Sequence, residues 1–229
     1  MTGNGTPPRL RNPLARITVF LGLLVLYQLG FALVVALLFY GVEAAPPGGP
    51  PPEPPPFHPF AGGRDTVLVV LSIAGTIALP LLAWRLVDRR PFSHLGLIRT
   101  RGEAGKLLFG TAAGGGLALL VFLIGTALRF GGIEAGEGAA GRPAIGILTI
   151  ETLVLLAAAA SEEVVFRGYL LSNFLQAGGP PYAVAFSAVL FAALHVLNPH
   201  FFTGLAPLNI LLIGGVLALA RLPAGGLAL

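Results

Sequence analysis

Long apolar stretches without a single charged side chain dominate this sequence. Several contain no Asp, Glu, Lys or Arg at all: 17–42, 66–84, 107–128 and 168–220. A helix needs about 20 residues, at 1.5 Å rise per residue, to cross the hydrocarbon core of a bilayer. Such a segment crosses as a helix because lipid offers no hydrogen-bond partner to a free peptide group. The pattern therefore predicts an all-α fold, a polytopic transmembrane helical bundle.

The hydrophobic runs can be delimited as separate segments, and their ends predict the helices. The segments are 17–40, 66–87, 106–128, 146–176, 181–198 and 204–221. We therefore expect about six spans in this chain. The fourth segment is too long for a simple span, so it must tilt or emerge into water at one end.

The segments and their connections divide the chain into regions of different character. These regions are a basic N-terminus at 1–16, a first transmembrane helix at 17–43, a Pro/Gly-rich linker at 44–65, a second and a third transmembrane helix with a basic loop at 66–145, and a last region at 146–229. The linker is typical of a polyproline II or disordered spacer. We see no internal repeat and no soluble domain.

Composition supports the membrane interpretation and gives the expected topology. Charged residues make up 10% of the chain and hydrophobic ones 55%, whereas about a quarter of an ordinary soluble domain is charged. The cations flank the apolar runs, where they set topology, so the net charge of +4 does not indicate nucleic-acid binding. The absence of cysteine excludes disulfides and thiolate metal sites. We expect a multi-pass protein of the bacterial cytoplasmic membrane with its N-terminus, its basic loop and the turn at 178–181 inside.

Ionisable residues within spans are costly and are therefore functional candidates, and the sharpest group is the run SEEVVFR at 161–167. Glu163 and Arg167 are four residues apart in the order that favours a helical ion pair, so Glu163 is the structural carboxylate. Glu162 points about 100° away, on the face of Phe166, Tyr169 and Asn173, and has no local partner. One carboxylate is thus expected to be free to act on a substrate.

His195 lies in the next apolar segment, at the same predicted depth as Glu162. With a turn centred between Gly178 and Gly179, each of the two residues is about 16 positions from it. Equal distances from the turn of an antiparallel helical hairpin mean equal depth. Phe191, one helical turn from His195, would wall the site. A carboxylate and an imidazole held together in this way could activate a water molecule as general base and acid.

Both motifs together resemble a known signature. Glu162-Glu163-x-x-x-Arg167 followed by Phe191-x-x-x-His195 is similar to the paired motif of the CPBP intramembrane protease family. That family includes type II CAAX prenyl endopeptidases and bacteriocin-processing proteins and is also called the abortive-infection family. The resemblance implies an all-helical membrane fold and endopeptidase activity. It assigns catalysis to Glu162 and His195, supported by Glu163 and Arg167, and makes 146–229 the catalytic region.

The sequence departs from the family pattern in one respect. The family usually has a further His, followed four residues on by Asn, in a later helix, and no His follows Leu205 here. We therefore expect the sequence to be a fragment that is truncated at the C-terminus. Weaker candidates for additional site residues are Asn198, Asn209 and Glu151, although neither Asn fits the missing motif.

The remaining expectations concern the cofactor, the partners and the alternative functions of the protein. Zinc takes three or four protein ligands, and the obvious ones here are Glu162 and His195, because Glu163 is better used by Arg167. We favour a metal-free, glutamate-activated water, with a divalent metal as the alternative. The expected partners are a peptide or membrane-protein substrate and the lipid bilayer, with no nucleic acid. Rival functions are a proton-coupled transporter and a non-catalytic membrane scaffold or immunity protein on the same fold.

Overall fold

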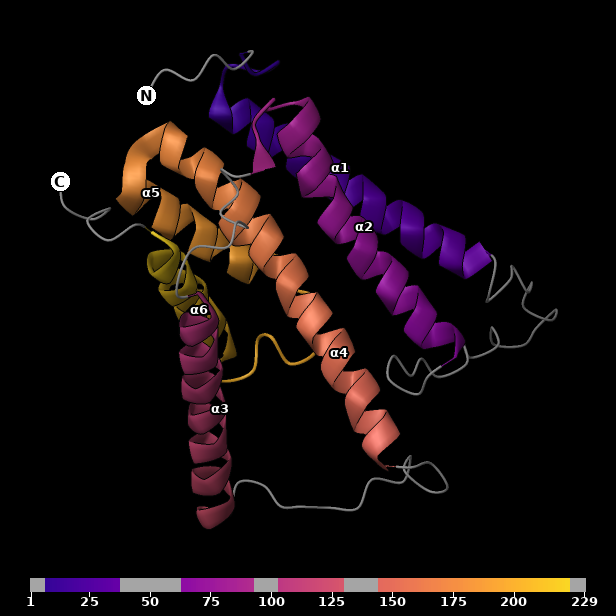
Figure 1. The fold of residues 1–229 in the computed structure, drawn as a ribbon, viewed down its shortest axis with the longest axis vertical. Helices are drawn as coiled ribbons and strands as arrows, with labels where there is room; N and C mark the ends of the chain where they lie inside the picture. Colours follow the sequence, from indigo (N-terminus) through magenta and orange to yellow (C-terminus); the bar gives the residue numbers. More distant parts are fainter. Residues whose placement is uncertain (1–6, 38–62, 93–102, 130–143, 223–229) are drawn as a thin grey trace. The chain divides into compact units, whose positions relative to one another are not determined.

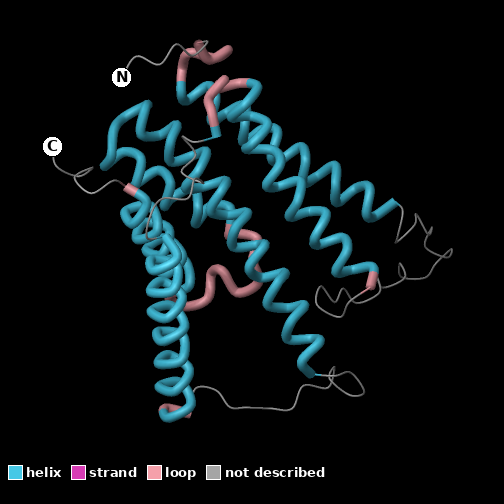
Figure 2. The backbone as a smooth tube through the Cα atoms, viewed as in Figure 1, coloured by secondary structure: helices cyan, strands magenta, loops and turns pink. Residues whose placement is uncertain are grey.

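The described residues form helices joined by turns. A computed structural model describes residues 7–37, 63–92, 103–129 and 144–222 (Figures 1 and 2). Their elements in chain order are α1 (Pro13–Val35), α2 (Arg64–Leu86), α3 (Glu103–Ala127), α4 (Ala144–Glu162), the π-helix η4 (Glu163–Leu170), α5 (Leu171–Leu194) and α6 (Ala206–Arg221). The predicted all-α fold is confirmed. The Pro/Gly-rich linker at 44–65 lies largely outside the described residues.

Helix ends agree with the predicted segments to within a few residues in most cases. The segment 66–87 corresponds to α2, and 204–221 corresponds to α6. The segment predicted at 181–198 ends sooner, because α5 stops at Leu194 and the chain turns at His195. Among the described residues, α1, α2 and 108–127 of α3 are long and apolar enough to cross a membrane, whereas α6 is shorter. The expectation of about six spans is thus only roughly supported.

The chain reverses direction inside α5 at Gly179. This residue has φ 77° and ψ −173°, a region of backbone space that is essentially restricted to glycine. Pro180 and Pro181 follow, and their fixed φ suits the first turn of the returning helix. Figure 1 shows α5 doubling back at this point. The hairpin predicted from the Gly-Gly-Pro-Pro sequence is therefore present.

The chain divides into two compact units, residues 1–97 with 148–229 and residues 98–147. The second unit contains α3, an apolar helix of 25 residues. The first unit contains every residue proposed for the site.

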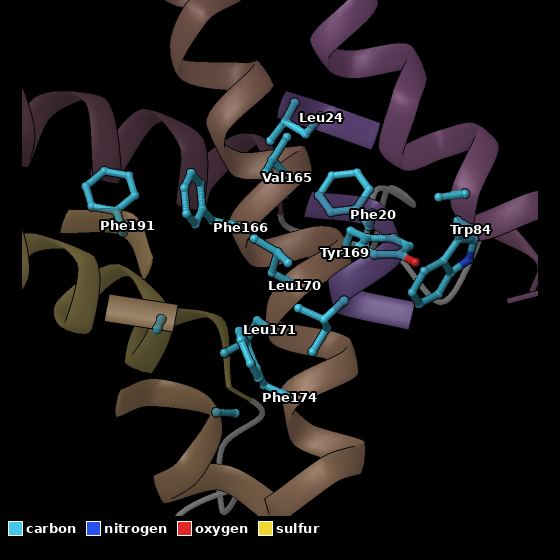
Figure 3. Close-up of a cluster of buried hydrophobic side chains, with 14 residues drawn as sticks. Phe20, Leu24, Trp84, Val165, Phe166, Tyr169, Leu170, Leu171, Phe174 and Phe191 are labelled. Carbon is cyan, nitrogen blue, oxygen red and sulfur yellow. The ribbon is translucent and has the colours of Figure 1, made fainter. Parts of the chain in front are cut away.

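The core of the first unit is built around η4. Residues 164–170 are all buried, and aromatic side chains of α1 and α2 pack against them (Figure 3). Phe20 lies 4.4 Å from Tyr169 between ring centroids, and Trp84 lies 6.1 Å from the same ring. The segment that carries the paired carboxylates is thus held by packing on several sides.

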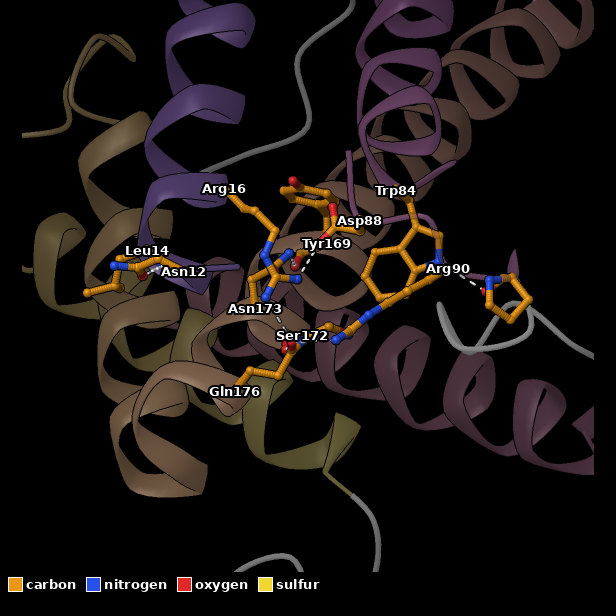
Figure 4. Close-up of polar contacts among 11 residues, drawn as sticks. Asn12, Leu14, Arg16, Trp84, Asp88, Arg90, Tyr169, Ser172, Asn173 and Gln176 are labelled. Atoms are coloured by element: carbon orange, nitrogen blue, oxygen red, sulfur yellow. Dashed lines mark hydrogen bonds and ion pairs between the residues drawn. The ribbon is translucent and has the colours of Figure 1, made fainter. Parts of the chain in front are cut away.

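A polar cluster joins three elements at one end of this unit (Figure 4). Arg16 Nη1 forms an ion pair with Asp88 Oδ1 at 2.5 Å, and both side chains are buried. Arg16 Nη2 donates to Gln176 Oε1 at 3.1 Å, and Arg90 Nη2 donates to the same oxygen. The start of α1, the end of α2 and the turn of α5 therefore lie at the same end, as the charge pattern predicted. Which side of the membrane this end faces stays a prediction.

Candidate functional site

Glu162 is the last residue of α4 and directly precedes the π-helix. A π-helix closes its hydrogen bonds one residue later than an α-helix, and short ones occur frequently at functional sites. The wider turn changes which side chains share a face. Phe166 lines the same cleft as Glu162, whereas Tyr169 and Asn173, predicted on that face, are fully buried in the core. Regular α-helical spacing therefore held only for the first turn after Glu162.

The structure brings Glu162 and His195 together. His195 Nε2 lies 3.9 Å from Glu162 Oε1, and the side chains are 21% and 44% exposed. His195 follows the last residue of α5, so the hairpin at Gly179 is what returns it to the depth of Glu162. The proximity predicted from equal distances to the turn is observed, while the catalytic roles of the two residues stay a prediction.

A hydrogen bond sets the orientation of the His195 ring. Nδ1 lies 2.7 Å from the carbonyl oxygen of Phe191. Because a carbonyl oxygen only accepts, Nδ1 carries the proton, and Nε2 of the neutral ring is left with a lone pair. That lone pair is on the side of the Glu162 carboxylate. When the ring is neutral, two acceptors therefore face each other across a gap of 3.9 Å.

The two side chains open onto a cleft of about 510 Å³. Most of its wall is apolar, and its polar side chains come from α1, α2, the end of α4 and the segment that follows α5. Such a lining is typical of sites that bind an apolar or extended ligand. The lining residues are Leu21, Leu24, Val25, Gln28 and Leu29 of α1, Thr76 of α2, Ser161, Glu162, Val165 and Phe166 of α4 and η4, and Leu194, His195, Leu197 and Asn198 at the end of α5.

Glu163 and Arg167 form the predicted ion pair, with 3.4 Å between Arg167 Nη1 and Glu163 Oε1. The pair is unequal, because the Arg167 side chain is 2% exposed and that of Glu163 is 50% exposed. The guanidinium carbon also lies 4.7 Å from the centroid of the Phe191 ring, a cation–π distance. Neither residue lines the cleft, which supports a structural rather than a direct role.

The other predicted residues divide into those near the site and those away from it. Phe191 is buried and packs against the rings of Phe166 and His195, at 4.9 and 4.4 Å. Asn198 lines the cleft, and its backbone N–H donates to the His195 carbonyl oxygen at 2.9 Å. Asn209 on α6 and Glu151 on α4 are not among the lining residues.

Sequence reasoning missed the wall that faces Glu162. Gln28 of α1 and Thr76 of α2 line the cleft, and neither was a candidate. The available signal was a polar side chain inside an otherwise apolar span, which by itself marks a functional candidate. The pairing of α1 with the region after α4 was the missing information, because it joins residues far apart in the sequence.

The described residues provide an incomplete set of ligands for a metal ion. They contain no group of three or more His, Asp or Glu side chains placed to hold a metal ion. Glu162 and His195 are two potential ligands, and a protein zinc site takes at least three. The residues described thus do not fit a zinc centre on their own.

Comparison with known proteins gives one match. Residues 144–229 match the family model described as type II CAAX prenyl endopeptidase Rce1-like. No curated protein and no solved structure matches the chain. The matched region begins at the first residue of α4 and includes both motifs. Together with the apolar helices, the match identifies an integral membrane protein. Residues 144–229 are thus similar to the Rce1-like type II CAAX prenyl endopeptidase family, in agreement with the resemblance that the two motifs carry.

Proposed function

We propose that this protein is an intramembrane endopeptidase in which Glu162 and His195 activate a water molecule. The observation that carries the proposal is the 3.9 Å separation between Glu162 Oε1 and His195 Nε2 at the wall of the cleft. Both groups act as acceptors towards the gap. A water molecule has two O–H donors and fits between two acceptors at this spacing, with bonds of roughly 2.8 Å.

The reaction follows from that arrangement. Water donates one O–H to the Glu162 carboxylate and the other to His195 Nε2. As the water oxygen bonds to the peptide carbonyl carbon, its proton moves to Glu162. Glu162 then passes this proton to the amide nitrogen, the C–N bond breaks, and a carboxylic acid and an amine leave. The side-chain amide of Asn198 is the candidate donor to the oxygen that becomes negative.

Arg167 and Glu163 act through Phe191 in this proposal. The Arg167 guanidinium packs over the Phe191 ring, and the Phe191 carbonyl oxygen accepts from His195 Nδ1. The ion pair therefore supports the residue that fixes the His195 tautomer. Its members are positioning residues and do not touch the substrate.

The substrate class is a peptide or protein tail presented at the membrane. The family name points to prenylated CAAX peptides, and the largely apolar cleft is compatible with such a ligand as well as with an unmodified membrane-protein tail. The proposed chemistry uses the side chains of this chain alone and needs no metal ion.

The test compares Glu162→Gln with a matched substitution of another carboxylate on the same helix. Both variants and the wild type are reconstituted in lipid vesicles without an ion gradient and given an internally quenched, farnesylated CAAX peptide. A set of unmodified transmembrane peptides is assayed by mass spectrometry. We expect Glu162→Gln to lose at least about 100-fold in cleavage rate while Glu151→Gln, outside the cleft, cleaves like the wild type.

Other outcomes identify the rival functions. Wild-type cleavage by Glu162→Gln would refute the assigned role. Flux that depends on a gradient, without cleavage of any peptide, would indicate a transporter. Activity that disappears with EDTA and returns with zinc would contradict the metal-free step. Absence of both cleavage and flux in the wild type would favour the scaffold.

A further inference from the structure

One face of α1 forms a wall of the cleft and carries a single amide. Residues 21, 24, 25, 28 and 29 line the cleft, which is the spacing of one helical face. Four of these residues are Leu or Val, and the other is Gln28. An uncharged but strongly polar amide on a membrane-crossing helix is costly unless it meets a polar partner. Gln28 is therefore a candidate for a functional residue of the cleft wall.

Two contacts fix how α1 runs along the consecutive helical elements α4, η4 and α5, at whose first junction Glu162 lies. Arg16 bonds to Gln176 at 3.1 Å, and Phe20 packs on Tyr169 at 4.4 Å. Residue numbers rise on one helix as they fall on the other, so the two helices are antiparallel. Two further turns along α1, matched by a similar distance back towards α4, reach Gln28 on one side and the start of η4 on the other.

Gln28 thus lies at about the depth of the paired acceptors, on the facing wall. The cleft is lined by Gln28, Glu162 and His195 together. The lined face of α1 extends from Leu21 to Leu29, or about 12 Å at 1.5 Å per residue. That length accommodates about three to four residues of extended peptide at roughly 3.3 Å each.

The hydrogen bonds around Gln28 determine which end of the amide is available. Thr76 Oγ1 donates its proton to the Ser72 carbonyl oxygen at 2.8 Å, so it can only accept from Gln28. Gln28 Nε2 accordingly donates to Thr76 Oγ1 at 3.1 Å. Oε1, the acceptor end of the amide, accepts no hydrogen bond from a side chain or backbone group in the part of the chain described. The Thr76 hydroxyl thereby orients an acceptor at the cleft.

We propose that Gln28 positions the substrate by accepting a backbone N–H of the bound peptide through Oε1. This inference rests on the proposed function and adds a residue to it. A peptide bond must present its carbonyl carbon to the water between Glu162 and His195, and a hydrogen bond from the opposite wall restricts how the peptide can lie. Gln28 would thus bind the main chain of the peptide, so the contact is independent of the substrate's side chains.

The competing interpretation is that Gln28 and Thr76 only join α1 to α2, as polar pairs do between membrane helices. The two interpretations differ in what a change at Gln28 affects. Loss of a helix–helix bond lowers thermal stability and leaves peptide affinity unchanged in the folded fraction. Loss of a substrate contact raises Kd and KM and leaves the rest of the reaction little changed.

The experiment measures peptide binding in the Glu162→Gln background, so that cleavage does not interfere. The probe is the farnesylated CAAX peptide, made in a series in which one backbone amide at a time is N-methylated. We expect Gln28→Met to weaken binding of the unmodified peptide about three- to tenfold. One N-methylated peptide should show the same loss, and Gln28→Met should add nothing to it, because both changes remove the same bond.

The controls separate folding from binding and this inference from the function it rests on. Thr76→Ser keeps the hydroxyl that orients Gln28 and should bind like the parent, whereas Thr76→Val should weaken binding to a smaller extent than Gln28→Met. Independent, additive losses from Gln28→Met and every N-methylation would overturn the inference, as would a peptide affinity unchanged by Gln28→Met or undetectable peptide binding. Cleavage that persists in Glu162→Gln would instead refute the proposed function while leaving the Gln28 contact standing.

Discussion

At the scale of single residues, the site depends on which groups have a hydrogen-bond partner and which do not. The Phe191 carbonyl oxygen accepts from His195 Nδ1 at 2.7 Å, and this bond leaves Nε2 as an acceptor towards Glu162. Phe191 is itself packed against the Arg167 guanidinium. The two acidic side chains of the motif differ in position, because Glu162 lines the cleft and Glu163 is not among the lining residues.

The unequal exposure of the Glu163–Arg167 pair predicts unequal effects of removing either member. Glu163→Gln leaves a buried guanidinium without its ion-pair partner, and an arginine cannot shed its proton. Arg167→Met removes that charge and leaves a half-exposed carboxyl group, which can take up a proton. We expect Glu163→Gln to cost on the order of 2 kcal/mol of unfolding free energy and Arg167→Met clearly less.

Equilibrium unfolding in detergent, followed by circular dichroism, measures this difference. Glu151→Gln on the same helix is the reference, and it should lie within about 0.5 kcal/mol of the wild type. Equal losses for the two motif variants would show that the ion pair is not asymmetric in the way the side-chain exposures indicate.

At the scale of elements, the hairpin in α5 delivers His195 to Glu162. The Gly-Gly-Pro-Pro sequence made this turn predictable, because Gly179 adopts a positive φ and the prolines start the next helix. The π-helix could not be predicted in the same way. Its residues Val164 to Leu170 are all buried against other elements, so packing rather than local propensity sets its geometry. Hydrophobic runs predict where helices lie but not how a helix deviates within itself.

A substitution at Gly179 tests the importance of the turn. Gly179→Ala forces a Cβ atom into a backbone region with φ 77° and ψ −173°, which costs about 1–3 kcal/mol. We expect a loss of unfolding free energy in that range and a larger fractional loss of cleavage, because His195 would shift relative to Glu162. Gly215→Ala in α6 is the matched control, since its added Cβ would meet only the Ala188 side chain at 3.8 Å. A wild-type cleavage rate for Gly179→Ala would show that the conformation of this turn does not determine the position of His195 relative to Glu162.

At the scale of the whole chain, charge placement predicted which ends of the helices lie together. Arg16, Arg90 and Gln176 meet at one end, as expected if the N-terminus, the basic loop and the α5 turn share a side of the membrane. The sequence did not predict the partner of Arg16. Asp88 is 72 positions away in the chain, and one opposite charge within a basic loop does not stand out by pattern alone.

The Arg16–Asp88 ion pair predicts a large stability effect because it is buried on both sides. Asp88→Asn would leave Arg16, 2% exposed at its side chain, with a charge that the hydrogen bond to Gln176 satisfies only in part, and breaking a buried pair in this way costs about 3–5 kcal/mol. Replacing both members, as in Arg16→Met with Asp88→Leu, removes the stranded charge and should recover most of the loss.

Asp65→Asn, which affects the more exposed pair with Arg64, is the control and should cost less than about 1 kcal/mol. Unfolding in detergent measures all three, and a double variant no more stable than Asp88→Asn alone would mean that the cluster contributes through contacts other than its charges. Because this cluster joins α1 to α5, such variants should also alter the wall formed by α1, and therefore peptide affinity, before they abolish folding.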